Sequence, residues 1–576
     1  MSEAAGTATA AAARRAPPFS GVFGAVAMVL LVGTLVVMLY PLAIVFGESF
    51  VTENGISFGP FVDALTNAST LVVLYDTFVV VSTSTLLSLL VGSVFAWLNE
   101  RTDANVGTAA DILPLVPLLV PQIAGVTGWV VLLSPQAGFL NFAMRGFLSL
   151  FGVPIGAGPV NIFSYAGLIC VMTLYLVPYV YLVVSAALQQ LNPSLEEAAR
   201  MSGASPWKTL ARVTLPAIRP AIINAGIIVL IFAISMFSVP IVIGTGAGID
   251  LLSVRIYRLL YTYPPRLDQA ISLSIFMMVF VQIALLVQVV VARRGNFAVI
   301  GGKGQAISRV ELGRWRLVAK GSIVVYLLLT AVIPVIALAV VALQPFWTPH
   351  IDVAKFTLKN FAFVLFDNRL SVQAIANSIG LGLVGATVGM LLAAIFVVHS
   401  RNAGPQGHAF VDASTALPAT IPHTVIAVAM VAAFTGGLLN LHGTLWILLI
   451  AYLLISLPQA VRSARSAVTQ VGSDLIEAAQ MARSTQWRTF SRIVLPLMLP
   501  GLVAGWVILF VYISGELTAS ALLSGTANPV VGLVLLNMWE NGSFPQLAAI
   551  SLLMTILDVA VVFCVLRLFR LSASIS

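Results

Sequence analysis

Two polar stretches of this apolar chain share one pattern. Residues 196–216 read EEAARMSGASPWKTLARVTLP, and residues 476–496 read IEAAQMARSTQWRTFSRIVLP. Acids and bases at this spacing can cap helices and bind another polar surface, but they form no catalytic cluster and no metal-binding spacing. We therefore expect two copies of a binding element rather than an active site. Its matched positions are Glu197, Ala198, Ala199, Gly203, Leu215 and Pro216, with Glu477, Ala478, Ala479, Arg483, Leu495 and Pro496 in the second copy.

Each stretch begins with a helix-capping pattern. Ser194 and Glu197 have the spacing of a capping box, and Asp474 and Glu477 occupy the same places in the second copy. A short helix is expected to follow. In the first copy it should end at Gly203, because glycine readily adopts the left-handed conformation just past a helix end.

A second short helix is predicted after this bend. Ser205 and Thr485 are suitable N-cap residues, and Pro216 and Pro496 are expected to mark the entry into the next apolar segment. The copies differ at the bend, where Arg483 replaces a glycine. Since a non-glycine residue costs about 1 kcal/mol in the left-handed conformation, three readings stay open: a different bend, a contact made by the arginine itself, or a tolerated substitution.

The composition is that of a membrane protein. Hydrophobic residues make up 59% of the 576, charged residues 9%, and the mean hydropathy is +1.03, whereas soluble domains carry about 25% charged residues. Segments of about 20 apolar residues recur about twelve times. With both termini in the cytoplasm, most Lys and Arg lie on the inner loops, which fits the positive-inside rule and explains the net charge of +8 without nucleic acid.

The apolar segments form two halves of six spans each. A Pro-x3-Pro pattern at Pro117 recurs at Pro418, within third spans predicted at 110–133 and 409–436. The fifth spans are predicted at 219–244 and 499–524. Halves with an even number of spans enter the membrane in the same direction, so they are related by an axis along the membrane normal, with a pathway expected between them.

These boundaries predict an all-α polytopic membrane protein of about 12 transmembrane helices. The predicted parts are a disordered cytoplasmic tail (1–20), a first half (21–292, core 71–292), a cytoplasmic linker (293–317) and a second half (318–576, core 371–570). The polar stretches, the first loop (194–216) and the second loop (474–496), face the cytoplasm in this arrangement.

The two loops resemble the EAA loop of permeases from binding-protein-dependent ABC importers, and the fused six-plus-six layout resembles the type I importer transmembrane fold. The resemblance implies that each loop is a coupling helix seated on one of two copies of a cytoplasmic ABC ATPase. It also implies an external substrate-binding protein, alternating access, and a place in the cytoplasmic (inner) membrane of a prokaryote. ATP with Mg²⁺ would then be bound by the ATPase and not by this chain.

Other chemistry finds little support in the sequence. The segment Gly301–Gly304 lacks the Ser/Thr and the spacing of a phosphate-binding loop, so ATP hydrolysis must belong to another polypeptide. Cys170 and Cys564 are expected to be packing residues. No cofactor and no stably bound metal are predicted. The rival classes are an ion-coupled secondary transporter, which usually needs more ionisable residues within the membrane, and a membrane enzyme.

The substrate is less well defined. The segment GELTASALLSG, from Gly515, resembles the second half of ferric-iron permeases, with thiamine, aminophosphonate and polyamine permeases as alternatives. Candidate residues of the passage are Gln122, His423 and Glu516. A carboxylate would suit a hard cation in transit, although a structural role stays open for both His423 and Glu516.

Overall fold

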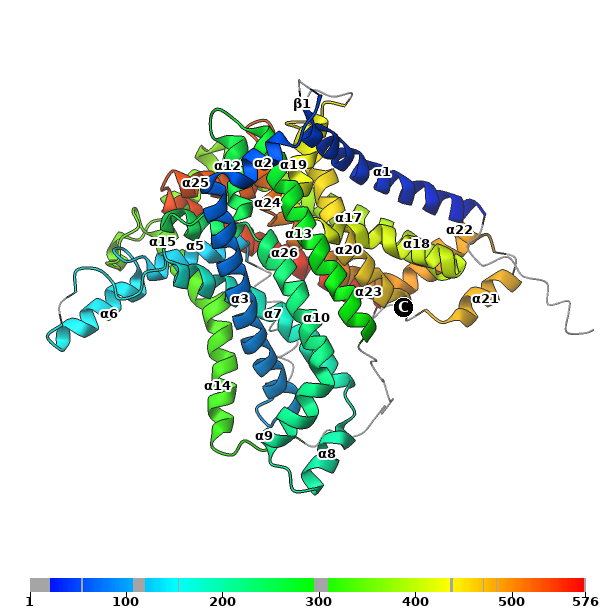
Figure 1. Cartoon of the computed structure of the whole chain (residues 1–576), viewed down its shortest axis with the longest axis horizontal. Helices are drawn as coiled ribbons and strands as arrows, with labels where there is room; N and C mark the ends of the chain where they lie inside the picture. The colour runs from blue at the N-terminus through cyan, green and yellow to red at the C-terminus, as the bar shows by residue number, and fades with distance from the viewer. Residues whose placement is uncertain are drawn as a thin grey trace, which may run out of the picture.

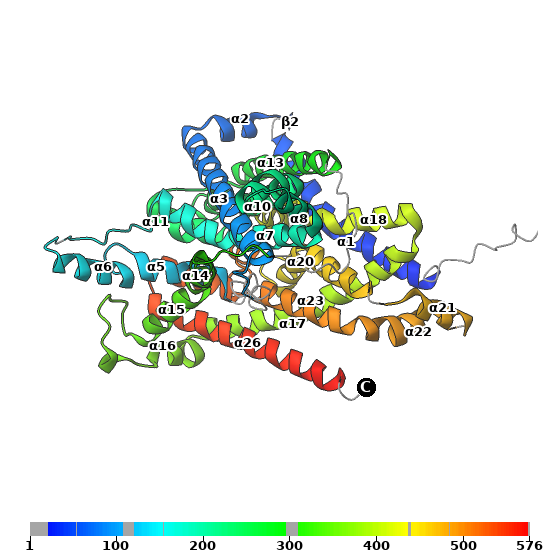
Figure 2. The ribbon, with the colours of Figure 1, turned by 90° about the horizontal axis from the view of Figure 1, so that it is seen from below.

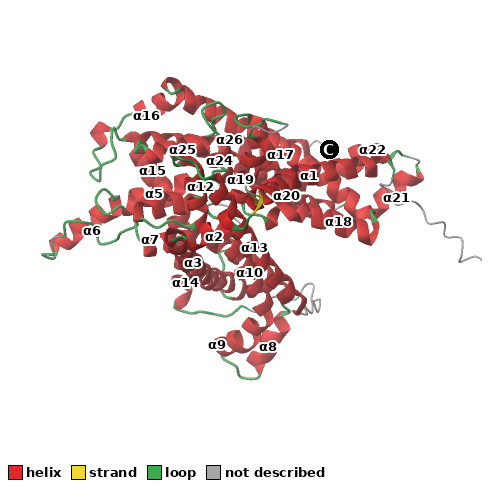
Figure 3. Cartoon of the chain, turned by 45° about the horizontal axis from the view of Figure 1, so that its top comes forward, coloured by secondary structure: helices red, strands yellow, loops and turns green. Residues whose placement is uncertain are grey.

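The computed structural model describes residues 21–52, 55–106, 120–153, 155–294, 309–435, 439–469, 471–482 and 484–573. Within these ranges nearly all regular structure is helical, and β1 (Val51–Thr52) pairs with β2 (Gly55–Ile56) in a short antiparallel ribbon (Figure 3). Ten helices are long and apolar enough to cross a membrane, or up to 12 spans if each of two bent pairs is one span. The predicted all-α polytopic fold is confirmed, whereas the tail 1–20 lies outside the described residues, as does most of the linker.

Long helices alternate with short ones along the first half. They are α1 (Val22–Phe50), α2 (Gly59–Thr66), α3 (Ala68–Arg101), α5 (Gln122–Leu133), α6 (Phe139–Leu150), α7 (Tyr165–Gln190), α10 (Leu215–Ser235), α11 (Thr245–Ala247), α12 (Leu252–Tyr261) and α13 (Leu267–Arg294).

The second half repeats this order. Its helices are α14 (Trp315–Leu327), α15 (Ile333–Leu343), α16 (Lys359–Ala362), α17 (Arg369–Asn402), α18 (Gly404–Ala416), α19 (His423–Phe434), α20 (Leu445–Val468), α23 (Leu495–Ser514), α24 (Thr518–Leu523), α25 (Val531–Glu540) and α26 (Phe544–Ala573). Helices α3 and α17 both have 34 residues and begin after an asparagine whose side chain accepts from the first turn. The internal repeat is therefore visible in the equal lengths and the matching N-caps of α3 and α17.

The third spans are not the straight helices that hydropathy predicts. In the second half, the helical segments Gly404–Thr420 and His423–Phe434 meet at 92°. The break falls at Pro422, which has no N–H group to continue the helix and which disfavours helical geometry in the residue before it. Helix α5 likewise starts directly after Pro121; residues 110–119 of its predicted span are outside the described residues.

The predicted fifth spans also end too late. Helix α10 stops at Ser235 and α23 stops at Ser514. The residues that follow α10 form a bent pair, Pro240–Ala247 and Leu252–Tyr261, which meet at 86°. The apolar residues after Ser235 and Ser514 are thus used to build a buried turn, which composition alone does not distinguish from a span.

The first helix of each half packs on the other half. Figures 1 and 2 both place α1 beside the helices of the second half, and the rings of Tyr40 and Phe434 lie 5.9 Å apart. In exchange, α14 and α15 lie against the first half, where the Tyr326 hydroxyl donates to the Leu174 carbonyl at 2.8 Å. The halves are therefore interlocked, while the first and second loops lie apart, at the bottom and at the right of Figure 1.

We predict that Gly128 is essential to this interlocking. A Cβ at this position on α5 would lie 2.7 Å from both the Cβ and the carbonyl oxygen of Pro334 on α15. Gly128→Ala is therefore expected to destabilise the protein by about 1–3 kcal/mol through overpacking. Thermal unfolding in detergent measures the effect.

The control is Gly33→Ala on α1, where an added Cβ meets nothing within 4 Å. Alanine is favoured over glycine in a helix interior, so the unfolding midpoint of this variant should be unchanged or raised. Equal midpoints for the two variants would contradict the close contact between α5 and α15.

Candidate functional site

The first loop begins with α8 (Pro193–Met201). Its cap is Asn192, whose side-chain oxygen accepts from the Ser194 N–H at 3.0 Å, so the predicted capping box at Ser194 is wrong by two residues. The reason is Pro193, which has no N–H to satisfy and fits the first helical position. The matching helix of the second loop is α21 (Ser473–Met481).

The bend of the first loop is confirmed as a glycine turn. Gly203 has a φ of +82°, and the Ala204 N–H donates to the Ala199 carbonyl at 3.0 Å. In the second loop, the Ser484 N–H donates to the Ala479 carbonyl at the same 3.0 Å. Arg483 itself lies outside the described residues, so the contact proposed for it stays a prediction.

The caps after the bend are also confirmed. The Ser205 hydroxyl accepts from the Lys208 N–H at 3.4 Å at the start of α9 (Pro206–Thr209). Thr485 accepts from the Arg488 N–H at 3.3 Å at the start of α22 (Gln486–Thr489). Both loops thus re-enter a helix in the same way.

Pro216 does not open the next span as predicted, because the helix runs without a break from Pro206 to Ser235. A π-helical turn, η2 (Leu210–Thr214), joins α9 to α10, and η8 (Phe490–Val494) joins α22 to α23. Proline lacks an N–H and its ring collides with the carbonyl four residues earlier. The wider turn, which hydrogen-bonds five residues back, accommodates the proline that follows it.

Both loops present large apolar side chains to solvent. Met201 is 91% exposed and Met481 is 73% exposed, at matching positions near the end of α8 and α21. Trp207 and Trp487 are also exposed, as are the pair Leu195 and Leu475. Exposed apolar groups beside Lys and Arg at these loops are typical of a surface that contacts another protein or lipid headgroups.

Sequence reasoning missed the methionine and leucine pairs. The sequence does contain a sign of both pairs, because Met201 and Leu195 each recur as the same residue type 280 positions later, at Met481 and Leu475. The predicted residues differ in exposure: Glu197, Ala199 and Leu495 are half-buried, whereas Ala198, Pro216 and Pro496 are exposed. The exposed methionine lies four residues beyond the predicted Glu197 or Glu477.

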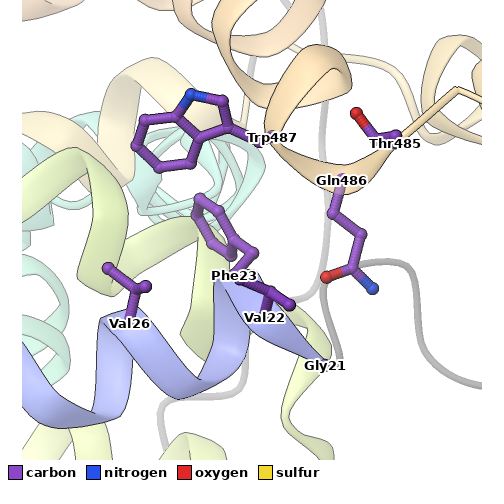
Figure 4. Close-up of a pocket in the computed structure, with 7 residues that line it drawn as sticks. All are labelled: Gly21, Val22, Phe23, Val26, Thr485, Gln486 and Trp487. Atoms are coloured by element: carbon purple, nitrogen blue, oxygen red, sulfur yellow. The ribbon is translucent and has the colours of Figure 1, made fainter.

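The start of α1 contacts the second loop. Gly21, Val22, Phe23 and Val26 line an open apolar groove of about 580 Å³ together with Thr485, Gln486 and Trp487 (Figure 4). The rings of Phe23 and Trp487 are 6.1 Å apart. In the first loop, Trp207 lies instead against Trp97 of α3, at 5.7 Å.

Two passage candidates lie at the helix breaks. Gln122 is the first residue of α5, and its side-chain oxygen accepts from the Ser238 hydroxyl at 3.2 Å. His423 is the first residue of α19, and its Nε2 lies 3.3 Å from the Tyr512 hydroxyl. The two side chains thus occupy equivalent places at the broken spans, although each contacts its own half.

Glu516 has a different environment. Its side chain is 8% exposed and accepts from the backbone N–H groups of Ala519 and Ser520 at 2.9–3.0 Å, which caps α24. The neighbouring Gly515 approaches the first half, since a Cβ there would lie 3.7 Å from the Pro121 Cα. This geometry favours the structural role for Glu516, and contact with the cargo stays a prediction. No group of three or more His, Cys, Asp or Glu that could hold a metal occurs among the described residues.

The chain matches one family twice, once in each half. Residues 84–296 and 385–574 match the family described as "Binding-protein-dependent transport system inner membrane component". Its relatives include a ferric transport system permease protein of Actinobacillus pleuropneumoniae, 25% identical over 83% of this chain and 68% of that protein.

Two further relatives show the range of sequence identity. A protein of Sinorhizobium fredii described as an ABC transporter permease is 31% identical over 69% of this chain and 70% of its own. A spermidine/putrescine transport permease, PotC, of Haemophilus influenzae is 24% identical over 34% of this chain and 76% of its own. This chain spans 66% and 68% of the length of two ferric transport relatives. With both halves matched, the chain belongs to the family of inner membrane components of binding-protein-dependent transport systems.

Proposed function

We propose that this chain is the permease of an ATP-driven importer and that both of its loops dock onto ATPase subunits. The observation that carries the proposal is the pair of exposed apolar loops, which share a closing hydrogen bond, a capped re-entry and an exposed methionine. A loop that occurs twice in one chain fits a partner that itself comes in two copies. ATP with Mg²⁺ would be bound by that partner, and hydrolysis would occur there.

The cargo that we favour is ferric iron. Supporting this choice are the ferric transport relatives, which are 25–26% identical over 74–83% of this chain. An external binding protein would deliver the cargo, and alternating access between the halves would release it to the cytoplasm. Both termini are placed in the cytoplasm, and no nucleic acid takes part.

A polyamine is the second candidate cargo, because PotC proteins match about a third of the chain, 34–36%. Thiamine and aminophosphonate remain alternatives from the sequence resemblance. The broken third spans, with Gln122 and His423 at their breaks, offer polar side chains at equivalent positions. We place the passage there, between α5 and α19.

We predict ATP-dependent uptake of iron. The chain, its ATPase and its binding protein are reconstituted in proteoliposomes, and uptake of labelled ferric iron, spermidine, thiamine and aminophosphonate is compared. Iron should accumulate only with hydrolysable ATP and the binding protein. Uptake that persists without ATP but collapses with the proton gradient would instead identify a secondary transporter, and preferential uptake of another cargo would correct the substrate.

The exposed methionines should be contact points for the ATPase. Met201→Glu or Met481→Glu would bury a charge in that interface, and we expect the amount of ATPase that co-purifies to fall about tenfold, equivalent to about 1.4 kcal/mol of binding free energy. The control is Leu150→Glu on α6, an exposed residue away from both loops. Unchanged ATPase capture by both methionine variants would place the docking surface elsewhere.

A further inference from the structure

We propose that Arg101, Glu196 and Thr214 form a buried clamp that positions the first loop, and that the second loop is held without one. The inference rests on the proposed function, because positioning matters only if the loop transmits motion. It assigns a role to three residues that lie outside the matched positions of the two loops.

The clamp centres on one carboxylate of α8. The Glu196 Oε2 lies 3.1 Å from the Arg101 Nε at the end of α3, and both side chains are nearly inaccessible, at 6% and 2% exposed. The other carboxylate oxygen accepts from the Thr214 hydroxyl. A single side chain thus joins the loop to α3 and to the π-helical turn that leads into α10.

Arg101 extends the clamp to a third span. Its Nη2 donates to the carbonyls of Leu188 and Leu191 at 2.6 and 3.0 Å, where α7 ends. A buried guanidinium needs a counter-charge, and removing either member of a buried pair leaves the other uncompensated. Charge-assisted hydrogen bonds are also directional, so the loop cannot shift without moving α3, α7 or α10.

The second half of the chain has the arginine of this arrangement and its bonds to two carbonyls. Arg401, at the end of α17, donates to the carbonyls of Val468 and Val471 at 3.3 and 3.0 Å, which are the equivalents of Leu188 and Leu191. Unlike Arg101, it is exposed. The backbone anchor is therefore common to both halves.

At the described positions of the second loop that match Glu196 and Thr214, the residues are apolar. Ile476 stands at the position of Glu196, and Val494 stands at the position of Thr214; both are buried. The acid and its hydroxyl donor are thus replaced together by two apolar side chains. Phe490 and Phe23, whose rings lie 5.1 Å apart, cover this cluster.

The two attachments have different mechanical consequences. Apolar packing is non-directional, so α21 can tilt against η8 at little cost. The Arg101–Glu196 ion pair and the hydrogen bond from Thr214 instead tie the base of the first loop to α3 and to η2. The first loop is therefore the stiffer transmitter of ATPase closure, and Glu196 is a positioning residue and not a contact with the ATPase.

Identical substitutions at equivalent positions test the clamp. In proteoliposomes with the ATPase and binding protein, Arg101→Gln and Glu196→Gln should lower uptake per ATP hydrolysed about tenfold, with the ATPase still bound. Arg401→Gln should stay within about twofold of wild type, because it removes no buried ion pair. Equal losses in Arg101→Gln and Arg401→Gln, or full activity of Glu196→Gln, would overturn the proposal.

A triple variant separates positioning from folding. Glu196→Ile and Thr214→Val give the first loop the apolar residues of the second, and Arg101→Leu removes the buried guanidinium that would otherwise lose its counter-charge, so the triple variant should restore assembly if a single variant fails to fold. We expect its uptake per ATP to stay low; wild-type coupling in this variant would mean that the clamp only stabilises the fold. Wild-type protein measured in parallel separates failure of the proposed function from failure of the clamp. An inactive wild type contradicts the proposed function. An active wild type with equally active variants contradicts only the clamp.

Discussion

The architecture depends on the need of every backbone polar group for a partner inside the bilayer, where water is absent. A proline inside a helix leaves a carbonyl of the preceding turn without its usual N–H partner. Four prolines of this chain stand where a helix begins or where a wider turn precedes them. Pro422 stands at a sharp break before α19 and Pro121 directly precedes α5, whereas Pro216 and Pro496 follow π-helical turns that keep the helix continuous. The first kind of proline ends a helix within the protein, and the second lets a loop on the membrane surface run directly into a span.

That continuity decides what the loops can do. Because α9, η2 and α10 form one helix from Pro206 to Ser235, the first loop is connected by continuous helix to the break that follows Ser235. The first helix of each half also connects the two halves. Phe23 of α1 contacts the second loop, and α15 packs on α5. Movement of one half is therefore felt by the other.

Sequence reasoning was most successful where the interaction is local. The caps Ser205 and Thr485 and the left-handed Gly203 can be predicted because they depend on residues within one turn of helix. The membrane class can be predicted from the composition. It failed where two signals compete: Pro193 displaced the cap from Ser194 to Asn192, and hydropathy could not separate a straight span from the bent pair around Pro422. The ion pair between Arg101 and Glu196 joins residues far apart in the chain, and no periodicity reports such a contact.

The comparison of the halves changes where asymmetry should be sought. The replacement of glycine by Arg483 is conspicuous in the sequence, yet the hydrogen bond between Ser484 and Ala479 matches that of the first loop. Ile476, by contrast, is an unremarkable apolar residue until the structure places it opposite Glu196. Since a buried acid is tolerated only with its counter-charge, the absence of Glu at this position and the exposure of Arg401 belong together. The two loops thus share an outer surface but differ at their base, so the two copies of the ATPase that we propose would bind loops that are held in different ways.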